Sequence, residues 1–287
     1  MLMKKIFILL MVGSLLFSCQ ITDVLNQEPP HNLTPDNAIT DEKSAETALT
    51  GIYGEQIGYE SYMSIGNHAM TAGILQRNDN PGVVVSIYYI ENRLPELNLV
   101  GAAYTPFWDA FNTIINSSTK LLAVLEGMSD NLFTDGRKTT MMGEIRFLRG
   151  WYMFDLLRMF GPLPTQLDSK AIPYKETISV SAPGMLTGNE VIEKVLTDLA
   201  EAESILKNWD PAVSEGMLMA VNDDDHDNDG NTYRFRGLRL NYYAVVALKA
   251  RVYLWAGNKT EALKYAKMII ENPEAETLYP AVTRAAA

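Results

Sequence analysis

The sequence predicts an all-α fold in which long loops separate the helices. Apolar residues recur every three to four positions in several stretches, the spacing of helices that bury one face. Glycine, proline and asparagine gather between these stretches and indicate loops. Of the 287 residues, 47% are apolar and 21% are charged, which is typical of a globular chain. The predicted helices cover residues 41–53, 104–127, 141–160, 187–207, 237–256 and 260–271.

The first helix follows a segment that disfavours helix. Residues 20–40 are rich in Pro, Asn, Asp and Thr, so we expect an extended tether there. Thr40 or Asp41 is a suitable N-cap, because a short polar side chain accepts a hydrogen bond from the free amides of the first turn. The helix then continues to Tyr53.

Residues 57–101 have irregular hydrophobic spacing and many glycine, asparagine and aromatic residues. A loop of this length within a compact helical protein is usually functional. Aromatic faces and planar polar groups suit sugar binding. The candidate ligand-binding residues are therefore Arg77, Asn78, Asp79, Tyr88 and Tyr89. If residues 83–90 form a strand, the two tyrosines point to opposite faces and only one contacts a ligand.

The helix at 104–127 has Pro106 near its first position, where proline is favoured, and Trp108 is assigned to the core. The helix at 141–160 is apolar around most of its surface, so we expect it in the middle of a bundle. Gly143 and Gly150 share one face and allow a neighbouring helix to approach closely.

Gly161 ends this central helix, and Pro162 and Pro164 prevent its continuation. Asp155 and Arg158 lie three positions apart, and we expect them to pair on its surface. The segments 161–187 and 208–232 are predicted loops, and the last two helices form a hairpin joined at residues 257–259.

An acidic motif in the second loop suggests a calcium site. Asp225, Asp227 and Asp229, followed by Gly230, can turn their carboxylates toward one hard cation. An EF-hand loop needs a glutamate at the twelfth position, where this chain has Arg236. A solvated acidic turn without a metal ion is the favoured alternative.

The N-terminus has the features of a signal peptide, which we assign to residues 1–18. Lys4 and Lys5 precede an apolar run, Ile6 to Phe17, of signal-peptide length. Cys19 is the only cysteine, so it cannot form an internal disulfide. The sequence before it resembles a bacterial lipobox, which implies that Cys19 is lipidated and anchors the mature chain in a membrane.

Charge and motifs restrict the function. The net charge is −11 and no basic stripe is present, which disfavours nucleic-acid binding. No metalloprotease, nucleophile-elbow or phosphate-binding motif occurs, and the three histidines are far apart in sequence. We therefore do not expect an enzyme. A glycoside hydrolase stays open as an alternative, because its acids are recognised by geometry.

Two stretches resemble the SusD/RagB family of outer-membrane lipoproteins. They are RFLRGWYMFDLLRMFGPLP at Arg146–Pro164 and SAETALTGIY at Ser44–Tyr53. The chain departs from the family pattern at Gly150, usually alanine, and at Pro162. The last hairpin, with Tyr253, Gly257 and Ala262, resembles a tetratricopeptide unit. The implied fold is a tetratricopeptide-like repeat with long loop insertions, occupying residues 41–287 and incomplete at its C-terminus.

The resemblance also implies a function. A relative of these proteins would capture an oligosaccharide or other nutrient at the cell surface and deliver it to a SusC-like TonB-dependent outer-membrane barrel. The residues alone support only a lipoprotein with a helical-repeat domain, so a scaffold for protein–protein contacts is a second hypothesis. A glycoside hydrolase is the third.

Overall fold

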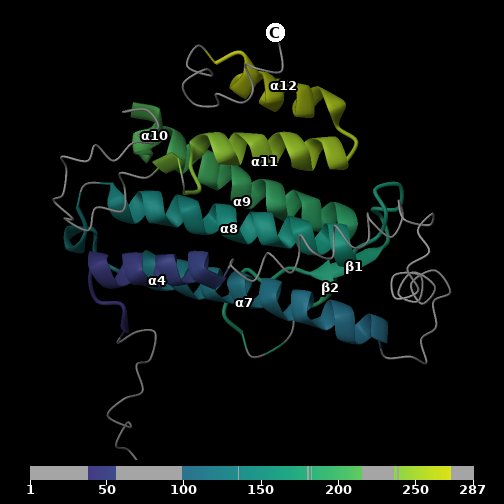
Figure 1. Cartoon of the computed structure of the whole chain (residues 1–287), viewed down its shortest axis with the longest axis horizontal. Helices are drawn as coiled ribbons and strands as arrows, with labels where there is room; N and C mark the ends of the chain where they lie inside the picture. Colours follow the sequence, from purple (N-terminus) through teal and green to yellow (C-terminus); the bar gives the residue numbers. More distant parts are fainter. Residues whose placement is uncertain are drawn as a thin grey trace, which may run out of the picture. The chain divides into compact units, whose positions relative to one another are not determined.

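The computed structural model describes residues 38–55, 99–134, 136–179, 181, 183–214, 236–237 and 239–272, and within 99–107 it describes the backbone only. The chain divides into two compact units, Met1–Ala38 and Ile39–Ala287, and every element below belongs to the second unit. Its helices are α4 (Glu42–Glu55), α7 (Leu99–Gly127), α8 (Arg137–Phe160), α9 (Gly188–Trp209), α10 (Pro211–Ser214), α11 (Tyr242–Trp255) and α12 (Lys259–Ile270), with a 3₁₀ turn, η2, at Asp130–Leu132 (Figure 1). The all-α prediction is confirmed.

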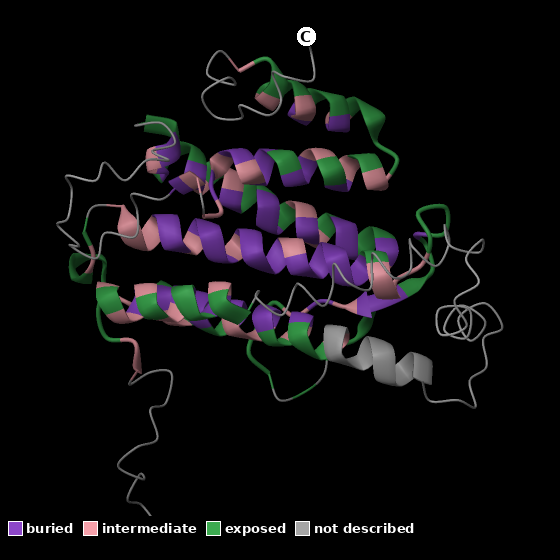
Figure 2. Ribbon diagram, in the orientation of Figure 1, coloured by how far each residue is buried: buried purple, intermediate pink, exposed green. Residues whose placement is uncertain are grey.

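Helix α8 is the central element of this unit. It packs along α9 and α7 and makes smaller contacts with α4 and α11. Most of its residues are buried, including polar Glu144, Arg149 and Asp155, so that it is purple along most of its length in Figure 2. The predicted position in the middle of a bundle is therefore confirmed. Its apolar side chains join those of its neighbours in one core cluster.

Two glycines explain the close packing of α8 on α9. A Cβ atom at Gly143 would lie 2.9 Å from both Ile205 and Leu206 of α9. At Gly150 it would lie 3.2 Å from Leu199 of the same helix. Both glycines thus face the neighbouring helix, as their shared face predicts.

The helix boundaries follow local capping chemistry. The Asp41 carboxylate accepts a hydrogen bond from the Ser44 amide at 2.8 Å and caps α4, as predicted. Gly161 follows the last residue of α8. Thr187 and Glu190 form a capping box at the start of α9. Gly257 has a φ of 82° in the turn between α11 and α12, a conformation that glycine adopts without strain.

The structure differs from the prediction at several places. Helix α7 begins at Leu99, so Pro106 lies inside it and not at its first turn; the proline removes one backbone donor, and the helix continues across that gap. Helix α11 begins at Tyr242, five residues later than expected, because the Asn241 side chain caps it. The loop at 161–187 contains two short antiparallel strands, β1 (Lys170–Pro173) and β2 (Met185–Thr187).

Candidate functional site

The residues chosen from the sequence for lipidation, ligand binding and metal binding lie outside the described part of the chain. They are Cys19, Arg77, Asn78, Asp79, Tyr88, Tyr89, Asp225, Asp227 and Asp229. These assignments stay predictions. The described residues form three polar clusters and one open surface, each of which is built from the helices of the core.

The first cluster surrounds Arg236, the residue at the twelfth position of the acidic motif. Its guanidinium is buried and donates to Asp210 Oδ1 at 2.7 Å and to the carboxylate of Glu144. Burial opposes its charge, but the two carboxylates dominate and raise the pKa of Arg236. Arg236 is therefore a structural residue directed into the core.

The same cluster joins segments that are far apart in sequence. Tyr53 of α4 donates its hydroxyl to Glu144 Oε2 of α8 at 2.6 Å. The amide of Tyr242, at the start of α11, donates to Asp210 Oδ2 at 2.8 Å. Burial and the nearby Glu144 carboxylate raise the pKa of Tyr53 well above 10. The cluster thus fixes α4, α8 and the start of α11 against the end of α9.

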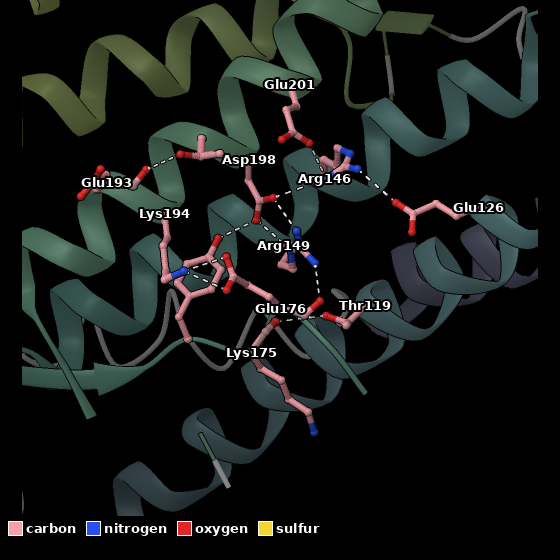
Figure 3. Close-up of polar contacts among 12 residues, drawn as sticks. Thr119, Glu126, Arg146, Arg149, Lys175, Glu176, Glu193, Lys194, Asp198 and Glu201 are labelled. Carbon is pink, nitrogen blue, oxygen red and sulfur yellow. Dashed lines mark hydrogen bonds and ion pairs between the residues drawn. The ribbon is translucent and has the colours of Figure 1, made fainter. Parts of the chain in front are cut away.

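The second cluster links α8 to α9 (Figure 3). Arg149 Nε donates to Asp198 Oδ2 at 2.7 Å and Arg149 Nη2 donates to Asp198 Oδ1 at 2.5 Å. The hydroxyl of Tyr174, which follows β1, donates to Asp198 Oδ2 at 2.6 Å. All three side chains are buried, and burial together with the Asp198 charge raises the pKa of Tyr174 well above 10.

Sequence analysis did not identify this cluster. The available signal was an arginine, Arg149, inside a mostly apolar helix, since a buried charge requires a partner. The partner on α9 was not visible, because Asp198 looks like one of many acidic residues on an amphipathic helix.

More exposed pairs surround the second cluster and border a shallow surface on α9. Arg146 bridges Glu126 of α7 at 3.1 Å and Glu201 of α9 at 2.5 Å, as Figure 3 shows. Lys194 pairs with Glu176 at 2.8 Å. The shallow depression has a volume of about 620 Å³ and is lined by Asn189, Ile192, Glu193, Leu196, Thr197, Ala200, Glu201 and Ser204.

This α9 surface combines apolar and acidic groups. Ile192, Leu196 and Ala200 form its apolar middle, and Glu193 and Glu201 supply carboxylates. Carboxylates accept hydrogen bonds from hydroxyl groups, and an apolar strip contacts the C–H face of a ring. The surface has the chemistry of a contact site, although every lining residue comes from a single helix.

The third cluster surrounds Asp155. Asp155 and Arg158 do pair, but the prediction that they pair on the surface is wrong, because Asp155 is buried. The Asp155 carboxylate is fully buried, and it accepts from Arg158 Nη1 at 2.7 Å and from Arg251 Nη2 at 3.3 Å. The indole of Trp151 donates to its other oxygen at 3.0 Å. Burial raises the pKa of Asp155, and the Arg251 and Arg158 charges oppose this effect.

Within the described ranges, no group of three or more histidine, cysteine, aspartate or glutamate side chains is arranged to hold a metal ion. Over the same part of the chain, none of the helices combines the length and the apolar character needed to cross a membrane.

The fold places the chain in the class of α-helical repeat proteins, because successive helices pair as hairpins and long segments connect the pairs. The chain belongs to the SusD-like family: the model of that family described as "Starch-binding associating with outer membrane" matches residues 28–214. The family predicted from the sequence is thereby confirmed. No protein with a curated description matches this chain.

One solved structure with a TM-score above 0.5 has the same fold, and two others are similar chains. A putative sugar binding protein from Bacteroides vulgatus is 19% identical, with a TM-score of 0.53, and the match covers 85% of this chain and 51% of that one. A SusD superfamily protein from Bacteroides thetaiotaomicron is 23% identical (TM-score 0.45; 57% and 31% covered). Surface glycan-binding protein A from Bacteroides uniformis is 18% identical (TM-score 0.42; 59% and 32% covered). The chain spans 31% to 51% of the length of these structures.

Proposed function

We propose that this protein is a lipid-anchored glycan-binding protein that captures oligosaccharide at the outer membrane and delivers it to a TonB-dependent transporter. The family match over residues 28–214 carries the proposal, because the model is described as starch-binding and associated with the outer membrane. The proposal assigns binding and transfer, and no catalytic step.

The anchor in this proposal is Cys19, which follows the signal-like segment. The wild-type protein, expressed in a bacterium with lipoprotein processing, is expected to enter the detergent phase of a Triton X-114 separation. Cys19→Ala is expected to remain in the aqueous phase. Equal partitioning of the two proteins contradicts lipidation at this position.

The proposed ligand residues are Arg77, Asn78, Asp79, Tyr88 and Tyr89. A screen by affinity electrophoresis and isothermal titration calorimetry, starting with starch oligosaccharides, tests for a saturable sugar site. Tyr88→Ala and Tyr89→Ala distinguish whether one tyrosine or both contact the sugar, with circular dichroism as the control for folding. The site is wrong if both variants bind the selected sugar as the wild type does.

A pull-down of the lipidated, tagged protein from detergent-solubilised outer membrane tests the partner. Recovery of a large β-barrel in fixed proportion supports the uptake function. If no barrel is recovered from correctly anchored protein, the transport step of the proposal is wrong.

A scaffold role is the second candidate, and exposed apolar residues of the last hairpin favour it. Leu254 of α11 and Leu263 and Ile270 of α12 are each about 60% exposed. These residues lie on two helices that pack together, and a contiguous apolar patch on such a hairpin would be a contact surface for another protein. A scaffold predicts a protein partner whose binding is lost in Leu263→Ser and Ile270→Ser, together with no saturable sugar site.

The acidic motif is tested separately. We propose calcium ligation by Asp225, Asp227 and Asp229, in which the ion stiffens its own loop. Calorimetric titration with calcium is expected to show one site that is lost in the triple Asp→Asn variant. Absence of calcium binding at millimolar concentration establishes the alternative, a solvated acidic turn.

A further inference from the structure

Two arginines on different helices share a single buried carboxylate. Arg158 near the end of α8 and Arg251 in α11 both donate to the same oxygen, Oδ1, of Asp155. Asp155 is inaccessible to solvent, whereas the side chains of Arg158 and Arg251 are 31% and 45% exposed. The two cations are therefore held at the protein surface by an anion that lies beneath them.

The charges in this cluster do not balance. Two guanidinium groups and one carboxylate leave one positive charge in excess. The two buried arginines among the described residues differ: Arg149 is paired with the carboxylate of Asp198, and Arg236 lies between those of Glu144 and Asp210. A local positive excess is unusual for a chain with a net charge of −11.

Aromatic packing holds both guanidinium groups in place. Cζ of Arg158 lies 5.6 Å and Cζ of Arg251 lies 5.7 Å from the centre of the Phe154 ring. Phe154 is itself buried and meets Trp255 edge-to-face, with ring centres 5.7 Å apart. Because the ring and the carboxylate restrict the arginines, little further ordering is needed when an anion binds.

The exposed donors suit an oxyanion. Each guanidinium has five N–H groups in a planar fork, and Asp155 accepts one hydrogen bond from each arginine. The remaining N–H groups of such a fork match the oxygen atoms of a carboxylate. Trp255, one helical turn after Arg251, is half-buried and packs against the Phe154 ring that both arginines approach.

We propose that Arg158 and Arg251 together bind the carboxylate group of an acidic sugar, so that the glycans captured by this protein include uronic acids. This inference rests on the proposed glycan-binding function and names one class of ligand for it. Arg158 and Arg251 provide the charge, and Asp155 positions both guanidinium groups without contacting the sugar.

The test compares two probes of equal length, oligogalacturonate and its fully methyl-esterified form, by calorimetry with the full chain at low salt. Esterification removes the negative charge and keeps the sugar backbone. We expect at least tenfold tighter binding of the charged probe, with affinity that falls as salt is added. A carrageenan oligosaccharide, which is sulfated and has no carboxylate, distinguishes carboxylate binding from general attraction to anions, and we expect it to bind more weakly than oligogalacturonate.

The variants are Arg158→Gln and Arg251→Gln, with Lys264→Gln, another exposed cation, as the matched control. Each arginine variant leaves the other arginine paired with Asp155, so the buried carboxylate keeps a partner and the fold is retained. Both are expected to weaken oligogalacturonate binding about tenfold and to leave the esterified probe unaffected. Lys264→Gln is expected to change neither affinity.

The outcomes separate this inference from the function on which it rests. Binding of neutral oligosaccharides without a preference for the charged probe overturns the inference alone. Oligogalacturonate binding that both arginine variants retain also overturns it, since the carboxylate then binds elsewhere. If no oligosaccharide, neutral or acidic, binds the folded protein, both the inference and the glycan-binding function are wrong.

Discussion

Arg149 of α8 and Asp198 of α9 form a two-point ion pair in the interior of the helix interface, with N–O distances of 2.7 and 2.5 Å. A buried pair of this kind contributes little net stability compared with apolar side chains, because both charges lose their hydration. Its geometry nevertheless requires that the two helices meet at one register. The pair therefore acts mainly to specify how α8 and α9 align.

Removing one partner of this pair is expected to be costly. Arg149→Met leaves the buried Asp198 charge with the Tyr174 hydroxyl and a distant Arg146 guanidinium at 3.9 Å, and the free energy of unfolding should fall by about 3–5 kcal/mol. Urea denaturation measures this change. Lys194→Met, which breaks the exposed pair with Glu176, is the control and should cost less than about 1 kcal/mol. Equal losses in the two variants would contradict the buried role of Arg149.

Alanine substitutions at the two glycines of α8 are expected to change the stability of the protein by different amounts. Gly143→Ala places a methyl group against Ile205 and Leu206 at 2.9 Å, and overpacking of this kind costs about 1–3 kcal/mol, partly offset by the better helix propensity of alanine. Gly150→Ala meets a mobile methyl of Leu199 at 3.2 Å and should be nearly neutral.

Gly51→Ala is the control for this series. Gly51 lies in α4 with open space around it, so alanine there should stabilise the protein by about 0.5–1 kcal/mol. Thermal unfolding of the three variants is expected to give the order Gly51→Ala, Gly150→Ala, Gly143→Ala from most to least stable. A Gly143→Ala protein as stable as Gly51→Ala would show that the helices are not in close contact there.

The raised pKa of Tyr53 leads us to expect that the folded protein becomes less stable above pH 10. Its pKa is raised above 10 in the folded protein by burial and Glu144, so the unfolded chain releases the phenolic proton first. This contribution is complete below pH 10 and declines as the pH rises from 10 toward the folded pKa. Tyr53→Phe should lose about 1–3 kcal/mol at pH 7 and show a shallower decline above pH 10.

The measurement is urea denaturation at several pH values between 7 and 11. Tyr174→Phe provides a second case, since burial and Asp198 raise the pKa of Tyr174 in the same direction. Identical slopes for the wild type and both variants above pH 10 would show that these hydroxyls do not contribute to alkaline unfolding.

Because Asp210 and Arg236 form an ion pair, we expect that the segment between them can be replaced by a flexible linker without loss of the fold. Because the two side chains meet at 2.7 Å, the ends of the segment are held together by the core. Replacing residues 215–235 with a Gly-Ser linker of eight residues should leave the melting temperature within a few degrees of the wild type. The same replacement combined with Arg236→Met should unfold at a much lower temperature, because Glu144 and Asp210 then lose their shared cation.

Hydrophobic periodicity was sufficient to predict the helices and the central position of α8. Apolar residues on all sides of a helix leave only a buried location, and Gly143 and Gly150 even indicated the face that α9 covers. The start of α7 was wrong because Pro106 is a strong local signal that the surrounding helix overrides. Strands β1 and β2 are too short to show an alternating pattern.

The polar clusters could not be predicted from the sequence, for a different reason. Glu144, Asp155 and Arg236 look like ordinary surface charges, and each has a charged partner that lies between 26 and 96 positions away, such as Asp210 or Arg251. Periodicity describes one helix at a time, so it carries no information about which charges meet across an interface. The candidate ligand residues rest on composition and family resemblance alone.

The ion pair between Asp210 and Arg236 fixes the two ends of the segment that connects them. We therefore expect that segment to tolerate changes with little effect on the rest of the molecule. The entropy of closing a loop grows slowly with its length, by about 0.6 kcal/mol for each doubling. We therefore expect mutations and insertions at this location to have little effect on folding and to be selected mainly for binding. A lineage that carries this ion pair has a position at which new recognition sequences can be tried while the helical framework is inherited unchanged.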